Sequence, residues 1–275
     1  MLEILQTLII GAIQGVTEFL PVSSSAHLVL TPYIFGWGYK GLDFDVALHF
    51  GTVIAIVCYF WKDWMIIIKS AVGSRQSAED DLANSKQQTA NYPKNLLWQI
   101  IIATIPAGIA GFLINDYVES NLHSPILLAS NLVIFGIILY LVDRLVKKSN
   151  KLETIGFKQS FFVGLAQSLA LIPGISRSGI TMIASRSLGL KRESAARFSF
   201  LLGTPAMIGA FLFELKDLTL SDVRMPFILG IISSTIFGFL AIKYLLEYLK
   251  RGSFSVFMWY RIALAIIVVG IYLAR

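Results

Sequence analysis

Two long apolar stretches of this chain are each interrupted near the middle by residues that break helices or carry charge. The first stretch covers residues 2–30 and is broken at Pro21; the second covers residues 160–185 and is broken at Pro173 and again around Arg177. Irregular backbone at membrane depth is tolerated only inside protein or against a water-filled cavity. If the chain lies in a membrane, the two stretches are therefore predicted to be re-entrant helix–loop–helix elements.

The composition places the chain in a membrane. Of its 275 residues, 56% are hydrophobic and 15% are charged, whereas soluble domains carry about 25% charged residues. Long continuous apolar runs, rather than alternating ones, argue against a β-barrel. We predict an all-α integral membrane protein with about six full transmembrane helices, at residues 44–61, 96–114, 126–142, 198–213, 225–246 and 256–274.

A few other features limit the protein class. Cys58 is the single cysteine, so no disulfide framework or cysteine metal site is expected. Glu3 stands where a signal peptide would carry basic residues, and no cleavable signal is predicted. The net charge of +6 is assigned to membrane topology rather than to nucleic-acid binding.

The two broken stretches also resemble each other. Four residues of the first recur 153 positions later as the same residue type, and a Gly-Thr pair recurs 152 positions later. The matches are Gly11 with Gly164, Gln14 with Gln167, Ser23 with Ser176, Ser25 with Ser178, and Gly51-Thr52 with Gly203-Thr204. A near-constant offset indicates an internal duplication. We predict one membrane domain, 1–275, built of two repeats, 1–150 and 151–275.

Loop charges predict that the repeats are inverted. Basic residues concentrate in the loops at 143–158, 186–197 and 247–253, whereas the loop at 115–124 contains two acids and no Lys or Arg. Cytoplasmic loops carry the basic excess, so each half crosses three times after its broken element. The first element then enters from outside and the second from the cytoplasm, with both tips near the midplane. The polar loop at 70–95 is predicted to be a mobile cytoplasmic segment.

The first broken stretch contains an acid and a histidine. Ionisable groups inside a membrane are costly and usually mark function. Gln14 and Glu18 are four residues apart and share a helix face, and the break at Pro21 can fold His27 back toward the carboxylate. The alternatives are an exposed helix-end carboxylate for Glu18 and a satisfied core histidine for His27. Because the two share one loop, we place both in the site.

Serines follow both breaks. Ser23, Ser24 and Ser25 stand where a new helix could begin, and at least one is expected only to cap it. A helix N-terminus also offers N–H groups to an anion. Ser176 and Ser178 repeat this arrangement around Arg177, whose guanidinium can bind phosphate with two parallel hydrogen bonds; snorkelling to the membrane interface is the alternative.

Together these groups suit phosphoryl chemistry, in which positioning and charge neutralisation do most of the work. A site in the membrane favours a lipid phosphate as its ligand. The other two histidines lack such polar neighbours in the sequence. His49 is assigned to helix packing and His123 to an exposed loop.

The segments "QGVTEFLPVSSSAH" and "PGISRSGIT" resemble the undecaprenyl-diphosphate phosphatase family, also called the bacitracin-resistance protein family. The resemblance covers essentially the whole chain, including "ALHFGT" and "ATIPAG" between the two motifs. It implies a bacterial inner-membrane enzyme that hydrolyses undecaprenyl diphosphate to undecaprenyl phosphate and inorganic phosphate. It also implies recycling of the lipid carrier for peptidoglycan synthesis and resistance to bacitracin.

The resemblance further implies a divalent cation, Mg²⁺ or Ca²⁺, with Glu18 as its protein ligand. The family often has two glutamates four residues apart, but Gln14 replaces the first here and can act neither as a base nor as a strong metal ligand. In the family loop, Ser25 and Ala26 stand in place of Thr and Gly, which keeps the hydroxyl.

The expected roles follow from these residues. Arg177 holds the diphosphate, and Glu18 is a general base or a metal ligand. Ser24 or His27 is the nucleophile, His27 protonates the leaving group, or water attacks directly. Substrate contacts are expected from Gln14, Ser23, Ser25, Gly174, Ser176, Ser178 and Thr181. The site is expected to open to the outer face. A transporter or flippase for polyprenyl phosphates is the alternative function, and a homodimer is an open alternative to a monomer.

Overall fold

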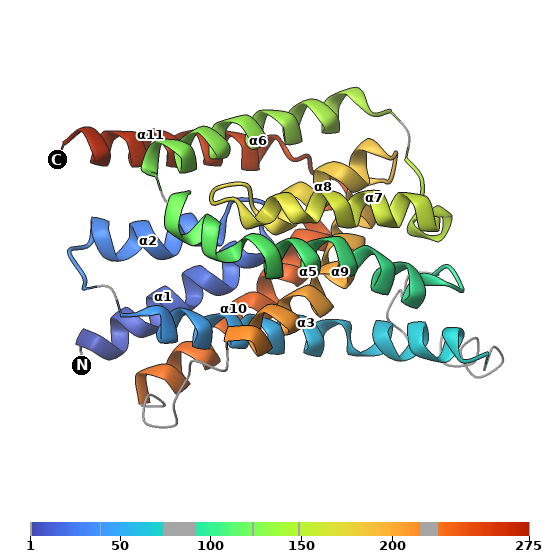
Figure 1. Ribbon diagram of the computed structural model, residues 1–275, viewed down its shortest axis with the longest axis horizontal. Coiled ribbons are helices and arrows are strands. Elements are labelled where there is room, and N and C mark those ends of the chain that lie inside the picture. Colours follow the sequence, from blue (N-terminus) through green and yellow to red (C-terminus); the bar gives the residue numbers. More distant parts are fainter. Residues whose placement is uncertain are drawn as a thin grey trace.

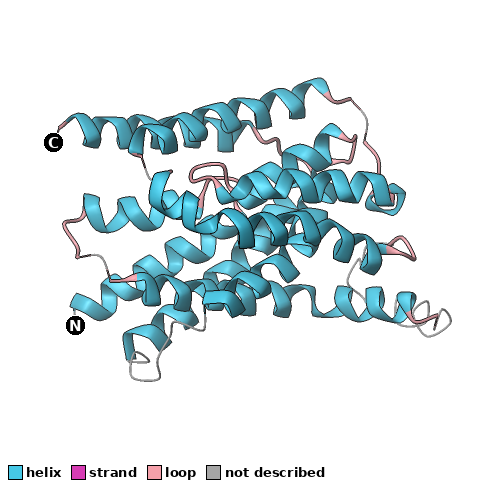
Figure 2. Ribbon diagram, in the orientation of Figure 1, coloured by secondary structure: helices cyan, strands magenta, loops and turns pink. Residues whose placement is uncertain are grey.

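The computed structural model describes residues 2–38, 40–73, 92–122, 124–147, 149–214 and 225–274. In these ranges the chain is helical, without strands beyond one isolated bridge between Asn150 and Leu190 (Figure 2). The all-α prediction is therefore confirmed. The helices are α1 (Leu2–Phe19), α2 (Ser24–Ile34), α3 (Leu42–Ala71), α5 (Leu96–Asn121), α6 (Pro125–Leu145), α7 (Phe157–Gln167), α8 (Arg177–Ser187), α9 (Arg192–Glu214), α10 (Met225–Leu249) and α11 (Ser255–Leu273), with short 3-10 turns η1 (Leu152–Thr154) and η2 (Ser168–Leu171).

Seven helices in the described ranges are long and apolar enough to cross a membrane. Six of them, α3, α5, α6, α9, α10 and α11, coincide with the six predicted spans, and α1 is the seventh. The chain is thus a multi-pass membrane protein. Most of the polar loop predicted to be mobile, residues 74–91, and His123 lie outside the described residues.

Helix α3 extends about ten residues beyond the predicted span 44–61, because its polar end is paired. The Asp63 carboxylate on α3 accepts a hydrogen bond from Arg197 Nη1 of α9 at 2.9 Å and another from the Tyr92 hydroxyl. These contacts compensate a buried charge that would otherwise favour ending the helix in water. The sequence pattern gives no sign of this pairing, because Tyr92 and Arg197 lie far from Asp63 along the chain.

Both broken stretches fold as helical hairpins. The first hairpin consists of α1, the loop around Pro21 and α2; the second consists of α7, η2, the loop around Gly174 and α8. In Figure 1 the first hairpin enters and returns at the left side, the second at the right side, and their tips meet between them. The tips are in contact, since Ser178 Oγ donates to the Leu20 carbonyl at 3.0 Å.

The two tips share an unusual backbone conformation. Ser23 has φ 74° and Ser176 has φ 75°, and these are the two non-glycine residues with positive φ in the described ranges. Such a conformation is costly for a residue with a side chain. The same strained geometry thus recurs at the pair of serines separated by 153 positions in the sequence.

Helix packing repeats in the same way. Helix α10 packs on α1 and α3, and its counterpart in the other half, α5, packs on α7 and α9. A Cβ on Gly11 of α1 would lie 2.8 Å from the Gly230 carbonyl of α10, and one on Gly164 of α7 would overlap the Ala103 carbonyl of α5. The small residue is therefore required at both positions for close helix approach.

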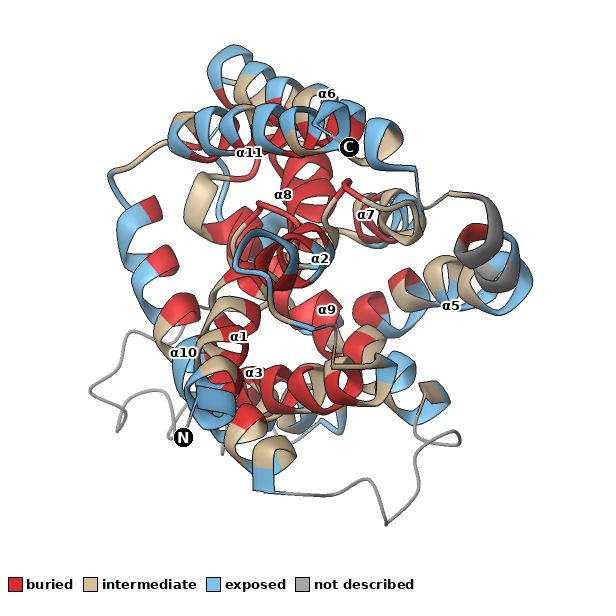
Figure 3. Cartoon of the chain, turned by 90° about the vertical axis from the view of Figure 1, so that its left-hand side faces the viewer, coloured by how far each residue is buried: buried red, intermediate tan, exposed pale blue. Residues whose placement is uncertain are grey.

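The buried side chains lie where the halves meet, and the periphery is apolar. Figure 3 shows buried residues concentrated on α8, α9 and the inward faces of α1 and α3. Phe19 and Phe200 pack edge to face at the centre, both fully buried. Large apolar side chains such as Phe112 and Leu113 of α5 point outward, as expected of a surface covered by lipid.

Candidate active site

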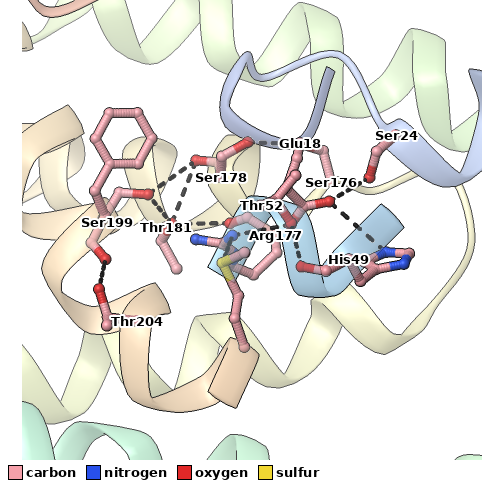
Figure 4. A network of polar contacts seen from close by, with 12 residues as sticks. Glu18, Ser24, His49, Thr52, Ser176, Arg177, Ser178, Thr181, Ser199 and Thr204 are labelled. Atoms are coloured by element: carbon pink, nitrogen blue, oxygen red, sulfur yellow. Dashed lines mark hydrogen bonds and ion pairs between the residues drawn. The ribbon is translucent and has the colours of Figure 1, made fainter. Parts of the chain in front are cut away.

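Glu18 lies in the last turn of α1, and its buried carboxylate is the centre of a polar network (Figure 4). Oε2 accepts hydrogen bonds from Ser24 Oγ at 2.8 Å and from Gln14 Nε2 at 3.1 Å. Oε1 accepts from Arg177 Nη2 at 3.0 Å. The carboxylate therefore joins the first hairpin to the second, and the shared face predicted for Gln14 and Glu18 is observed.

Arg177 is the first residue of α8 and supplies the cation of this network. Its Nη2 also contacts Met207 Sδ at 2.7 Å, whereas Nη1 is buried without a hydrogen-bond partner among the described residues. Gly203 leaves room for the guanidinium, since a Cβ there would overlap Nη1. The arginine is thus held inside the protein with a free donor, which fits an anionic ligand and not a side chain that snorkels to the interface.

The first residues of two helices contact the Glu18 carboxylate. Ser24 starts α2 and Arg177 starts α8, and both contact Glu18. The N-terminal ends of helices carry partial positive charge and unpaired N–H groups. The arrangement therefore favours negative charge at the point where the two hairpin tips meet.

The flanking serines mainly hold the tips. Ser23 and Ser25 hydroxyls lie 3.2 Å apart, as do those of Ser176 and Ser178. Ser176 Oγ accepts from the Gly179 N–H at 3.2 Å and caps α8. In the first run, where a capping serine was expected, Ser23 precedes α2 without a side-chain cap bond. Ser25 is exposed, so its hydroxyl is open to a ligand.

Thr181 is buried and engaged with the protein. Its hydroxyl donates to the Arg177 carbonyl at 2.8 Å and lies 2.6 Å from Ser199 Oγ on α9. These contacts fix the first turn of α8, which carries Arg177. Gly174, at φ 88°, provides the bend, and a Cβ there would lie 2.7 Å from the Leu128 carbonyl.

His27 has both ring nitrogens occupied. Nδ1 lies 2.7 Å from the Ser23 carbonyl, so it carries the proton, and the neutral Nε2 accepts from the Tyr260 hydroxyl at 2.6 Å. The two rings stack with centroids 5.6 Å apart. In the described part of the chain these are its polar contacts, and Glu18 is not among them. Tyr260 on α11 is a site neighbour that sequence reasoning missed.

His49, which sequence reasoning assigned to helix packing, lies beside the carboxylate. Its Nε2 is 3.9 Å from Glu18 Oε2, and its Nδ1 is 2.8 Å from the Asp45 carbonyl one turn earlier in α3. Its side chain is 39% exposed, against 10% for Glu18. The available signal was its position two residues before the repeated Gly51-Thr52 pair.

Arg261 of α11 is a second residue that sequence reasoning missed. It is fully buried, and among the described residues its guanidinium donates to backbone carbonyls of both hairpin tips and of α6. The acceptors are Pro21 (3.3 Å), Gly174 (2.8 Å), Ile175 (3.1 Å), Asn131 (3.2 Å) and Leu132 (3.0 Å). Arg261 therefore ties the two tips together. A charge inside an apolar run was the overlooked signal.

We expect Arg261→Met to lower the free energy of unfolding by about 2–4 kcal/mol, because several buried carbonyls lose their donor. Thermal unfolding of the purified protein in detergent measures the effect. Arg251→Met is the matched control, since Arg251 is exposed in the turn after α10. An unchanged melting temperature for Arg261→Met would show that the tips hold together without this side chain.

The site offers a divalent cation few protein ligands. The described residues contain no group of three or more His, Cys, Asp or Glu side chains that could hold a metal ion. Glu18 is the one carboxylate in the network, and Gln14 Oε1 beside it is buried without a hydrogen-bond partner. Mg²⁺ is usually bound by one or two carboxylates together with substrate phosphates. Glu18 therefore fits one ligand position of a cation whose remaining ligands come from a bound phosphate, and the neutral Gln14 amide adds no strong ligand.

Comparison with known proteins finds one matching family and many relatives over the whole chain. The family model described as bacitracin resistance protein BacA matches residues 7–267. The chain is 44% identical over 274 residues to the undecaprenyl-diphosphatase of Pelotomaculum thermopropionicum, covering 100% of this chain and 98% of the relative. It is similarly 44% identical to that of Moorella thermoacetica, covering 100% of both chains, and 42% identical to that of Methanosphaera stadtmanae, covering 98% of both.

Proposed function

Since this chain belongs to the bacitracin resistance protein BacA family, we propose that it is an undecaprenyl-diphosphatase. It hydrolyses undecaprenyl diphosphate to undecaprenyl phosphate and inorganic phosphate. This reaction returns the lipid carrier to peptidoglycan synthesis. It also removes the diphosphate form of the carrier, and we attribute to this removal the bacitracin resistance for which the family is named. The observation that carries the proposal is the contact between Glu18, in the last turn of α1, and Arg177, the first residue of α8, beside Ser24, the first residue of α2.

The geometry supports a division of roles. Arg177 Nη1, the N–H groups that begin α2 and α8, and the exposed Ser25 hydroxyl bind the diphosphate oxygens. Glu18 is the general base, since its Oε2 accepts a hydrogen bond from the Ser24 hydroxyl at 2.8 Å and is placed to take that proton. A divalent cation held between Glu18 and the substrate would neutralise phosphate charge.

Ser24→Ala and His27→Ala separate the possible nucleophiles. We expect Ser24→Ala to be the more damaging, because Ser24, unlike His27, donates to the Glu18 carboxylate, whereas both His27 nitrogens are occupied elsewhere. A phosphoserine route requires a loss of at least about 10³-fold in kcat. Trapping a phosphoenzyme and testing its acid and base stability is the second measurement. Substantial turnover by Ser24→Ala, without a phosphoenzyme, would favour attack by water.

Gln14→Glu tests the cation. The new carboxylate would stand about 3 Å from Glu18, where Gln14 Nε2 now donates, and two such charges repel unless a cation lies between them. We expect the variant to remain active in millimolar Mg²⁺ and to lose at least about 10-fold more activity than wild type when EDTA is added. Equal sensitivity of both proteins to EDTA would argue against a cation at this position.

The site lies in the bacterial inner membrane, between two re-entrant hairpins of an inverted repeat whose halves are residues 1–150 and 151–275. The recurrent tip geometry and the exchanged packing of α5 and α10 support this duplication. The accessible groups, Ser25 and His49, belong to the first half, and the basic residues Lys191 and Arg192 follow the second hairpin. The opening therefore faces outward, away from the cytoplasm.

Single cysteines in a Cys58→Ser background test this orientation. Gly38 and Ser149 are both exposed, the first beyond α2 and the second between α6 and α7. A membrane-impermeant thiol reagent added to intact cells should label a cysteine at position 38 and not one at position 149. The opposite pattern would place the opening on the cytoplasmic side.

The inverted repeat also fits a transporter or flippase of polyprenyl phosphates. Purified protein in vesicles loaded with a polyprenyl diphosphate distinguishes the two. The phosphatase converts the lipid to its monophosphate, whereas a transporter moves uncleaved lipid between leaflets.

A further inference from the structure

Two neighbouring residues of α11, Tyr260 and Arg261, together hold both hairpin tips around their strained serines. A residue with a side chain keeps a positive φ only where the surrounding structure fixes it. At the second tip, Arg261 donates to the two carbonyls directly before Ser176, those of Gly174 and Ile175. The backbone that leads into this strained serine is thus fixed by a direct hydrogen-bond donor.

At the first tip the corresponding contact runs through a histidine. The Tyr260 hydroxyl donates to His27 Nε2 at 2.6 Å, and His27 Nδ1 donates to the Ser23 carbonyl at 2.7 Å. Because a carbonyl can only accept, Nδ1 carries the hydrogen and Nε2 is the acceptor for the hydroxyl. These groups therefore form one continuous chain of hydrogen bonds from α11 to the carbonyl of the strained residue.

The tyrosine ring adds a second constraint on the histidine ring. The two rings stack with their centroids 5.6 Å apart and an angle of 7° between their planes. His27 is 7% exposed, whereas Tyr260 is 46% exposed. With both nitrogens engaged and one face covered, the imidazole is fixed in the orientation that directs Nδ1 at the Ser23 carbonyl.

The Ser23 carbonyl matters to the site because it belongs to the peptide unit that leads into Ser24. Ser24 is the first residue of α2, and its hydroxyl donates to Glu18 Oε2 at 2.8 Å. A peptide unit is planar, so fixing its carbonyl oxygen also fixes the N–H and Cα of the next residue. On the other side of Ser23, Arg261 donates to the Pro21 carbonyl at 3.3 Å. The tip is thus anchored on both sides of its strained residue.

We propose that Tyr260 is a positioning residue of this site, which acts through His27 and the Ser23 carbonyl to align the Ser24 hydroxyl with Glu18. The inference rests on the proposed phosphatase function. The role is geometric, and no proton transfer or bond cleavage takes place at Tyr260. Loss of its hydroxyl therefore slows the chemical step and leaves the binding of substrate nearly unchanged.

Steady-state kinetics of Tyr260→Phe test the proposal, because this change removes the hydroxyl and keeps the stacked ring. We expect kcat for phosphate release from a polyprenyl diphosphate to fall at least about 3-fold, with KM changed less than about 2-fold, since one hydrogen bond and no substrate contact is lost. Tyr272→Phe is the matched control, on the same helix and also 46% exposed, and it should match wild type. A fall in kcat of less than about 3-fold, or a KM changed by more than about 2-fold, would overturn the proposal.

The state of the His27 ring separates this role from a general loss of stability. In protein labelled with ¹⁵N at the histidine ring nitrogens, wild type should show His27 with the proton on Nδ1 and a hydrogen-bonded Nε2. The His27 signals are assigned by their loss in His27→Gln. Tyr260→Phe should shift the Nε2 signal toward that of an acceptor without a donor, whereas Tyr272→Phe should leave it unchanged.

The two measurements together give each failure its own signature. A slow Tyr260→Phe protein with an unchanged His27 spectrum would overturn the proposal, because the hydroxyl would then act by another route. Absence of phosphate release by wild type, with the His27 spectrum as expected, would instead refute the phosphatase function.

Discussion

Glu18→Gln is expected to fold normally and to lose at least about 10²-fold in kcat, the contribution typical of a general base. The amide keeps the size of the carboxylate, but it cannot accept a proton and does not neutralise Arg177 at 3.0 Å. The glutamine NH₂ group would also face donors such as the Ser24 hydroxyl, from which it cannot accept a hydrogen bond. Phosphate release under saturating substrate measures the loss.

The matched control is Glu3→Gln, on the exposed start of the same helix, where the side chain is 70% exposed. This variant should retain wild-type turnover. Comparable thermal unfolding of both variants would show that the loss at Glu18 is chemical. If Glu18→Gln stays within a few-fold of wild type, the buried carboxylate serves the fold and not the reaction.

Arg177→Lys should be nearly as damaging as Arg177→Ala, with both losing at least about 10²-fold in kcat/KM. The guanidinium contacts Glu18 and Met207 through Nη2 and keeps Nη1 available. A lysine ammonium retains the charge but not the planar fork that can serve both the carboxylate and a phosphate.

The two variants should differ in stability. Arg177→Ala leaves Glu18 buried without its cation, which costs about 3–5 kcal/mol when one partner of a buried pair is removed, whereas Arg177→Lys keeps a counter-charge. Arg251→Lys, in an exposed turn, is the control for the substitution itself. Near-normal turnover of Arg177→Lys would mean that only a point charge is needed.

The sequence predicts much of this fold because membranes impose simple rules. Length and hydropathy located all six main spans, and helix breakers located both hairpin tips. The repeated glycines were also informative: Gly11 and Gly164 both lie where a helix of the other half approaches closely. These features depend on local composition, which the sequence displays directly.

The sequence could not show which distant residues become neighbours when the helices pack. His49 reaches Glu18 from α3, and Tyr260 reaches His27 from 233 positions away. Arg261 lies in a run of mostly apolar residues, which was interpreted as a membrane span, and its charge was not considered further. No spacing rule relates such residues, because their contacts depend on how α3 and α11 dock against the hairpins.

The central claim is that the paired hairpin tips hydrolyse a lipid diphosphate. The direct measurement is the amount of inorganic phosphate released per polyprenyl diphosphate consumed by purified protein, with Glu18→Gln prepared identically as the blank. The claim predicts one phosphate and one polyprenyl monophosphate for each diphosphate consumed by wild type, and at most about 1% of that rate from the blank. Equal rates from the two proteins, or consumption without phosphate release, would contradict it.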